Sequence, residues 1–218
     1  MNPSHAAIRS LFLDGPAGRL EALLNVGEAN ATYAGLVCHP HPMFGGTMHN
    51  KVVYNAMKAL HSFGFPVLRF NFRGAGRSAG EHHGMQEVED VRAALSWLKQ
   101  EYALPIIFAG FSFGAAMGMM ACCPDSEVRA IISLGTPVAA EGRAYAYGFL
   151  QECRKPKLFL SGDHDQFGPH KELEAVVAGA AKPKELVFIP GDHFFEGHLH
   201  EMRMTVESWL DELLNPAA

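Results

Sequence analysis

The sequence predicts an α/β fold: a mostly parallel central sheet of about seven to eight strands with helices on both faces. Short apolar runs alternate along the chain with amphipathic segments, which is typical of strands separated by helices. The runs are apolar throughout rather than at every second residue, which favours strands buried on both faces. No repeat or linker-like segment interrupts this pattern, so we expect one domain over residues 1–218.

Eight apolar runs are the expected strands. They are 7–13, 19–26, 33–40, 66–72, 105–110, 129–135, 157–162 and 185–191. Only the turn sequence DGPAG separates the first two runs, so this edge of the sheet is expected to be antiparallel.

Apolar residues at helical spacing predict the intervening helices. These segments are 51–63, 88–102, 114–123, 169–177 and 202–213. The segment 138–154 lies between two expected strands, and it is the one insertion long enough to cover a site. It is too short for a large lid domain, so we expect at most a short cap.

Composition excludes several classes of protein. The formal net charge of −5 gives no reason to expect nucleic acid or an acidic membrane as a partner. No apolar stretch approaches the roughly 20 residues of a membrane helix, and no signal peptide is visible at the N-terminus. The four cysteines lack C-x-x-C spacing and indicate reduced thiols, as in a cytoplasmic protein. We expect no cofactor, and the oligomeric state is left open.

The strongest chemical signal is the sequence GFSFG at 110–114, which has the form G-x-S-x-G. It lies between an expected strand and an expected helix, the context that a nucleophile elbow requires. The turn at such an elbow is so sharp that the residues two before and two after the serine must lack bulky side chains. Ser112 is therefore the expected nucleophile.

A serine hydroxyl needs a base, and the base needs a carboxylate that orients it. With this type of elbow, the acid and then the histidine follow the serine in chain order, each after a later strand. The loop after 157–162 offers Asp163 and Asp165, and the loop after 185–191 offers His193. We expect His193 as the base and Asp165 as the acid, because Asp163 directly follows its strand and can cap the turn.

Two backbone N–H groups are needed to stabilise an oxyanion. Phe113, which follows the nucleophile, should supply one of them. The other should come from the loop at 39–50, in which two prolines lack an N–H group. Met43 is the first choice there, and His41 and Phe44 are alternatives.

A dinucleotide site is a competing interpretation, because residues 74–79, GAGRSA, satisfy G-x-G-x-x-A after a strand. Such a site requires a helix that begins within the motif. The helical pattern begins only near Met85, so this sequence favours a loop.

A metal site is a second competing interpretation, since histidines cluster in the same part of the chain. They are His39, His41, His49, His82 and His83. Two histidines separated by one residue can bind a metal, but loop histidines beside a cleft are the favoured interpretation, and we expect no metal.

Taken together, the motifs resemble a family of small bacterial α/β-hydrolase-fold proteins, described as hydrolases or carboxylesterases and related to dienelactone hydrolases. The resemblance covers nearly the whole chain. The stretches that carry it are HPHPMFGGTMHNKVV, LRFNFRGAGRSAGEH, AGFSFGAAM, SGDHDQFGP and PGDHFFEGHL. It implies an α/β-hydrolase fold and a triad of Ser112, Asp165 and His193. The dienelactone relatives use cysteine as the nucleophile, so their substrate is not carried over.

The expected function is hydrolysis of a small-molecule carboxylic ester through an acyl-enzyme, with short-to-medium acyl chains. A thioesterase, another acyl hydrolase or a non-catalytic binding protein with this fold are the alternatives. The side chains expected to line the substrate pocket are His41, Phe44, Tyr145, Tyr147 and Phe149.

Overall fold

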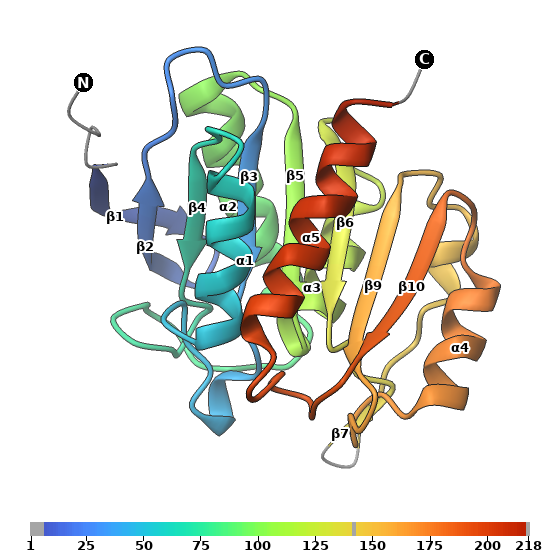
Figure 1. Ribbon diagram of the computed structural model, residues 1–218. Helices are drawn as coiled ribbons and strands as arrows, with labels where there is room; N and C mark the ends of the chain where they lie inside the picture. The colour runs from blue at the N-terminus through green and yellow to red at the C-terminus, as the bar shows by residue number, and fades with distance from the viewer. Residues whose placement is uncertain (1–6, 141–142, 217–218) are drawn as a thin grey trace.

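The computed structural model describes residues 7–140 and 143–216 (Figure 1). The ends of the expected domain and two residues of the expected cap therefore lie outside the described residues. Eight strands form one sheet in the order β1-β2-β4-β3-β5-β6-β9-β10. These strands are β1 (Ile8–Gly15), β2 (Gly18–Asn25), β3 (Ala34–Cys38), β4 (Val67–Phe70), β5 (Ile106–Phe111), β6 (Val128–Leu134), β9 (Lys157–Gly162) and β10 (Lys184–Ile189).

Strand pairing follows the apolar pattern. The β1–β2 pair is antiparallel, as predicted, and β2 also runs antiparallel to β4. The pairs β4–β3, β3–β5, β5–β6, β6–β9 and β9–β10 are parallel. Every residue of β3, β4, β5 and β9 is buried, which explains why these strands read as continuous apolar runs.

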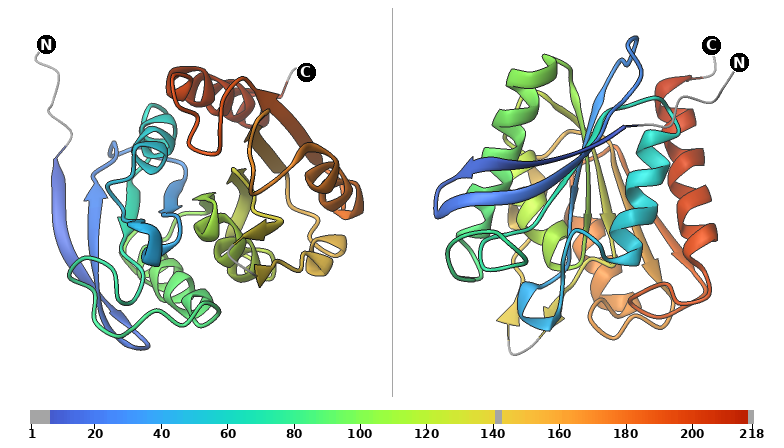
Figure 2. Two further views of the ribbon diagram at one scale, coloured as in Figure 1. Left: turned by 90° about the horizontal axis from the view of Figure 1, so that it is seen from below. Right: turned by 90° about the vertical axis from the view of Figure 1, so that its left-hand side faces the viewer.

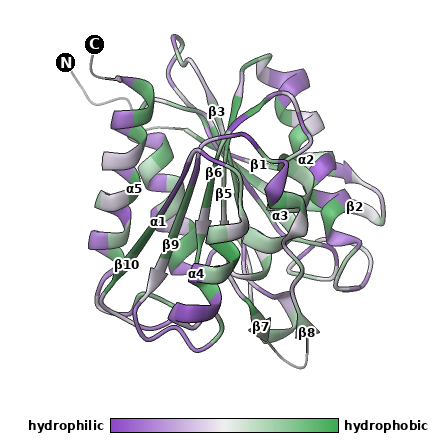
Figure 3. Cartoon of the chain, turned by 90° about the vertical axis from the view of Figure 1, so that its right-hand side faces the viewer, coloured by the Kyte–Doolittle hydropathy of each residue, from purple (hydrophilic) through white to green (hydrophobic). Residues whose placement is uncertain are grey.

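Helices cover both faces of the sheet (Figure 2), and the described residues include five α-helices. They are α1 (Lys51–His61), α2 (Glu87–Tyr102), α3 (Phe113–Cys122), α4 (His170–Gly179) and α5 (Leu199–Leu214). Helices α1 and α5 pack in one hydrophobic cluster, which includes Met57 and Val206. Helices α2, α3 and α4 pack in the other, which includes Leu95 and Leu173. Figure 3 shows the hydrophobic residues on the inner strands and hydrophilic ones on the outer surface of α5.

Helix α3 is buried along almost its whole length. A Cβ atom at Gly118 would lie 1.9 Å from Cζ of Phe108 in β5. The glycine therefore lets α3 lie directly against the sheet, and the small residues of this helix reflect that close packing.

The expected cap at 138–154 does not form a separate layer. It contains the short strands β7 (Ala139–Ala140) and β8 (Arg143–Ala144) and the 3₁₀ turn η2 (Gly148–Gln151). Tyr147 is buried in the cluster that includes α3 and α4, and its hydroxyl donates to the Pro137 carbonyl at 2.6 Å. The buried residues of this segment, which are Tyr147, Leu150 and Cys153, thus belong to the core beside the sheet, whereas most of its other described residues are exposed or half-buried.

A buried ion pair holds the loop that follows β4. The Arg73 guanidinium contacts both oxygens of Asp90 in α2, through Nε at 3.0 and 3.1 Å and Nη2 at 2.7 Å. The backbone N–H of Arg73 also donates to Asp90, and Nη1 donates to Gln86. The side chains of Arg73 and Asp90 are 5% and 0% exposed, so removing one partner would leave a buried charge without compensation.

We expect Arg73→Ala to lower the free energy of unfolding by about 3–5 kcal/mol, because Asp90 would remain buried and charged. Arg92→Ala is the matched control, since Arg92 pairs with Glu89 on the exposed face of the same helix and should cost less than about 1 kcal/mol. Urea unfolding of the three proteins measures both values. Equal costs would contradict a structural role for the buried pair.

Candidate active site

The elbow lies between β5 and α3, at the end of the sheet toward which the parallel strands point (Figure 1). Ser112 has φ +55° and ψ −121°, a conformation that costs an ordinary residue of order 1–3 kcal/mol. The backbone N–H of Ser112 bonds the Leu134 carbonyl of β6 at 2.9 Å. The strained turn is therefore anchored to the neighbouring strand.

The two glycines of the motif each occupy a position where a side chain would collide with backbone. A Cβ at Gly110 would lie 2.7 Å from N and Cα of Ala115, at the start of α3. A Cβ at Gly114 would lie 2.4 Å from the His39 carbonyl oxygen, in the loop after β3. The glycines let the elbow, the helix and the β3 loop meet.

Ser112, His193 and Asp165 form a continuous hydrogen-bonded chain. The distance from His193 Nε2 to Ser112 Oγ is 2.9 Å, and from His193 Nδ1 to Asp165 Oδ2 it is 2.8 Å. An ionised carboxylate only accepts hydrogen bonds, so Nδ1 carries the proton and Nε2 accepts the serine O–H. The structure thus brings together the three residues expected as nucleophile, base and acid.

The carboxylate of Asp165 is buried but fully hydrogen-bonded. Besides His193, it accepts hydrogen bonds from Ser161 Oγ at 3.1 Å and from the N–H groups of Phe167 and Gly168 at 2.8 and 3.2 Å. Burial on its own would raise the pKa of Asp165. The bonds from His193 and the two N–H groups outweigh burial and hold that pKa below its ordinary value. The carboxylate is therefore ionised when it faces the imidazole.

Both neighbouring aspartates shape loops. Asp163 is exposed and accepts the N–H of Gly191 at 3.1 Å, which ties the acid loop to the histidine loop. The carboxylate of Asp192 accepts hydrogen bonds from the N–H groups of Phe194 and Glu196 at 2.9 and 3.1 Å. These bonds form a local turn around His193.

His39 has a structural role that the sequence analysis did not predict. Its Nδ1 lies 2.6 Å from the Pro40 carbonyl, and its Nε2 accepts the Phe72 N–H at 2.9 Å, so the ring links the loops after β3 and β4. Burial lowers the pKa of His39 to about 4, against a smaller opposite effect of the Pro40 bond. The ring is neutral at neutral pH. A histidine at the end of a fully buried strand was the signal available in the sequence.

A cavity of about 230 Å³ lies beside Ser112 and His193. Its lining also includes Pro40, His41, Phe44, Gly45, Gly46, Asn50, Gln166, Phe167 and Phe194. Of the expected pocket residues, His41 and Phe44 therefore line the cavity. Tyr145, Tyr147 and Phe149 do not, because Tyr147 packs in the core and the other two pack against it.

The position of the Phe113 N–H group suits an oxyanion donor, whereas that of the Met43 N–H group does not. Phe113 is the first residue of α3, so its N–H has no acceptor within the helix. Met43 lies in the 3₁₀ turn η1 (Pro42–Phe44), and its N–H points to Nδ1 of His41 at 3.3 Å. Met43 does not line the cavity, whereas His41, one of the alternatives, does.

Neither competing interpretation finds support in the described residues. Both ring nitrogens of His39 have hydrogen-bond partners, and no group of three or more His, Cys, Asp or Glu residues is gathered there as a metal site. The glycine-rich motif at 74–79 forms a loop, and α2 begins only at Glu87.

Comparison with known proteins identifies the family of this chain. A family model described as an alpha/beta hydrolase domain matches residues 36–216. The chain belongs to the α/β hydrolase family. An uncharacterised protein of Rickettsia prowazekii is 34% identical over 209 residues, which are 92% of this chain and 87% of that protein.

Two solved structures are similar to this α/β hydrolase in both fold and sequence. One, described as an alpha-beta serine hydrolase homologue from Coxiella burnetii, is 37% identical with a TM-score of 0.85, over 93% of this chain and 97% of that one. The other, from Xanthomonas campestris, is described as a serine hydrolase without lid. It is 30% identical with a TM-score of 0.82, over 100% of this chain and 99% of that one.

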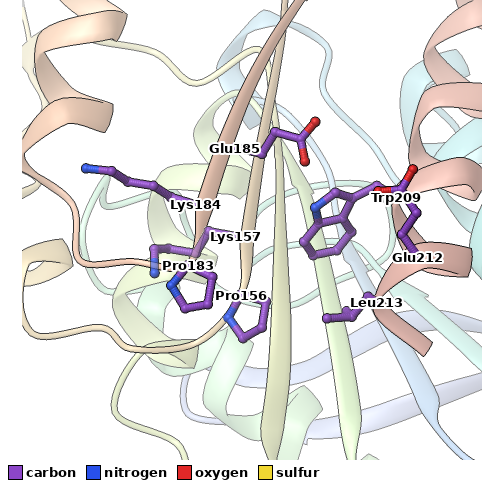
Figure 4. Close-up of a pocket in the computed structure, with 8 residues that line it drawn as sticks. All are labelled: Pro156, Lys157, Pro183, Lys184, Glu185, Trp209, Glu212 and Leu213. Atoms are coloured by element: carbon purple, nitrogen blue, oxygen red, sulfur yellow. The ribbon is translucent and has the colours of Figure 1, made fainter. Parts of the chain in front are cut away.

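Another cavity of this hydrolase, of about 260 Å³, lies where β9 and β10 begin (Figure 4). Ser112 lies at the opposite end of the sheet. The ammonium of Lys157 in this region donates to the Cys153 and Lys155 carbonyls, and that of Lys184 donates to carbonyls at the end of α4. Both lysines thus have structural partners.

In the described part of the chain, no helix has the length and apolarity that crossing a membrane requires.

The neutral state of His39 predicts a pH dependence of stability. Its folded pKa of about 4 lies below the ordinary 6.5, so between these values the unfolded chain binds a proton that the folded protein does not. Stability from this residue is present above pH 6.5 and is lost as pH falls toward 4, by about 1.4 kcal/mol per pH unit.

We expect His39→Gln to be less stable than wild type at pH 7 but to show a shallower loss of stability between pH 6.5 and 4.5. Urea unfolding across this range measures the slope, with the same substitution at exposed His200 in α5 as the matched control. Identical slopes for wild type and His39→Gln would contradict the buried, neutral imidazole.

Proposed function

We propose that this α/β hydrolase is a serine carboxylesterase that cleaves small-molecule esters through an acyl-enzyme. The observation that carries the proposal is the position of His193. It bonds Ser112 through Nε2 and Asp165 through Nδ1, and its ring is 2% exposed and surrounded by the rings of Phe111, Phe167 and Phe194. A buried imidazole in one tautomer is suited to accept the serine proton.

In the first half-reaction, Ser112 Oγ attacks the ester carbonyl carbon while His193 Nε2 takes the hydroxyl proton. The tetrahedral intermediate then collapses as the bond to the alcohol oxygen breaks, and His193 returns the proton to that oxygen. In the second half-reaction, water repeats these steps on the acyl-enzyme and releases the acid. Asp165 stays ionised throughout and stabilises the imidazolium that forms twice.

For the oxyanion we propose the N–H groups of Phe113 and His41 as donors. Phe113 opens α3, whose N-terminus favours negative charge. His41 replaces Met43 in this proposal because His41 lines the cavity with Ser112, whereas the Met43 N–H is directed to the His41 ring. Close contact between Gly114 and the His39 carbonyl holds the loop that carries His41 against the start of α3, which carries Phe113.

The cavity supports a short acyl group. Its volume of about 230 Å³ is below the roughly 300–1,000 Å³ of pockets that hold drug-sized ligands, which favours a small group. Phe44 and Phe194 on its rim are 66% and 48% exposed, so the site opens directly to solvent between aromatic side chains.

We expect Ser112→Ala to lower kcat/KM for p-nitrophenyl acetate by about 10⁴-fold or more, because the nucleophile is removed. Ser208→Ala, at an exposed position of α5, is the matched control and should keep wild-type activity. Covalent labelling by a fluorophosphonate, with the adduct located by mass spectrometry, tests the nucleophile without a substrate. Labelling of a residue other than Ser112 would overturn the assignment.

A proline substitution separates the His41 N–H from its ring. His41 has φ −56°, which is compatible with proline, so His41→Pro removes the N–H with little change in backbone conformation. His41→Ala removes only the imidazole. If the N–H is an oxyanion donor, kcat of His41→Pro should lie about 10²–10³-fold below that of His41→Ala. Equal kcat values would exclude this donor, provided that circular dichroism shows both variants folded.

A further inference from the structure

A second cavity, of about 630 Å³, adjoins the cavity beside Ser112. The two cavities share Asn50 and Phe194 in their linings. A molecule that occupied both cavities would therefore contact these two residues. The volume of the second cavity is more than twice that of the first and lies within the roughly 300–1,000 Å³ of pockets that hold drug-sized ligands.

The lining of the second cavity indicates what it can hold. Phe194 is 48% exposed and Leu199 is half-buried, and both present apolar surface, whereas Val52 behind them is 1% exposed. His49 and Asn50 add hydrogen-bonding groups to the lining. Lys51 and Glu196 are exposed and carry opposite charges, so the rim does not favour a ligand of either net charge. The cavity therefore suits a neutral, mainly apolar group that ends at a polar, solvent-exposed rim.

Phe194 connects this cavity to the proposed base. It follows His193 in the chain, and its ring lies 5.3 Å from the imidazole, centre to centre. In the acylation step, His193 Nε2 gives its proton to the oxygen of the departing alcohol, so that oxygen must lie within hydrogen-bonding distance of the imidazole. The departing half of the ester thus begins on the His193 side of the site, next to Phe194.

We propose that the second cavity is the subsite for the leaving group, and that the substrate is an ester with a short acyl half and a larger, neutral, mainly apolar alcohol half. This inference rests on the proposed esterase function and adds the direction in which the substrate lies. The acyl half occupies the smaller cavity beside Ser112, and the alcohol half extends past Phe194 toward Val52 and Leu199.

A pair of isomeric esters tests the direction. Octyl acetate and ethyl octanoate have the same atoms, but the long chain is on the alcohol in the first and on the acid in the second. We expect wild type to hydrolyse octyl acetate with a kcat/KM at least about tenfold higher than ethyl octanoate. Ethyl acetate provides the short reference for both, and a pH-stat measures all three reactions.

Two variants fill the second cavity from its exposed rim. Glu196→Trp and Lys51→Trp each place a large side chain there, and both positions are exposed, so the core is not altered. Each should lower the ratio of kcat/KM for octyl acetate to that for ethyl acetate by about tenfold. Glu174→Trp, at an exposed position of α4 outside both cavities, is the matched control and should keep the wild-type ratio.

The outcomes separate the two proposals. A lower ratio for octyl acetate in both filled variants supports the leaving-group subsite. A lower ratio for ethyl octanoate instead would assign the cavity to the acyl half, and unchanged ratios would show that substrate does not enter it. Each of these two results overturns the inference while the esterase function stands. If wild type hydrolyses none of these esters and Ser112 is not labelled by the fluorophosphonate, the proposed function fails first.

Discussion

The close approach of three backbone segments at Ser112 is the constraint on which the rest of the site depends. Gly114 lies so near the His39 carbonyl that a methyl group would collide with it, and Gly110 stands in the same relation to the first turn of α3. This contact places the start of α3 beside the loop after β3. The left-handed backbone of Ser112 is then maintained by its surroundings, including the bond to β6, and the hydroxyl is held toward His193.

Buried polar groups around this contact are satisfied in different ways. Asp165 keeps its charge because four donors surround it, whereas Asp90 is hydrogen-bonded by the guanidinium and the backbone N–H of Arg73. His39 is instead neutral at neutral pH, and both of its ring nitrogens form hydrogen bonds with backbone groups. The first arrangement serves the proposed chemistry, and the other two hold the loops after β3 and β4 in register with the elbow.

The sheet and the chain of Ser112, Asp165 and His193 could be predicted because each leaves a local mark. Buried parallel strands are continuous apolar runs, and the elbow needs glycine at two fixed positions. The pocket could not be predicted in the same way. The aromatic ring of Tyr147 suggests a pocket residue, but its hydroxyl donates to the Pro137 carbonyl and its ring packs in the core. Phe167 and Phe194 line the cavity because they neighbour the acid and the base, a relation visible only once the strands are placed.

The order of the strands has a consequence for how the protein gains and loses activity. The serine and histidine that share a hydrogen bond are separated by 81 residues in sequence, and the histidine follows β10, which lies at one edge of the sheet. Edge elements open at a lower free energy than the centre of a fold. A chain that has completed β3 to β6 holds a formed elbow without its base. Inactivation on heating can therefore precede the loss of most secondary structure, and refolding completes the site only once β10 has paired with β9.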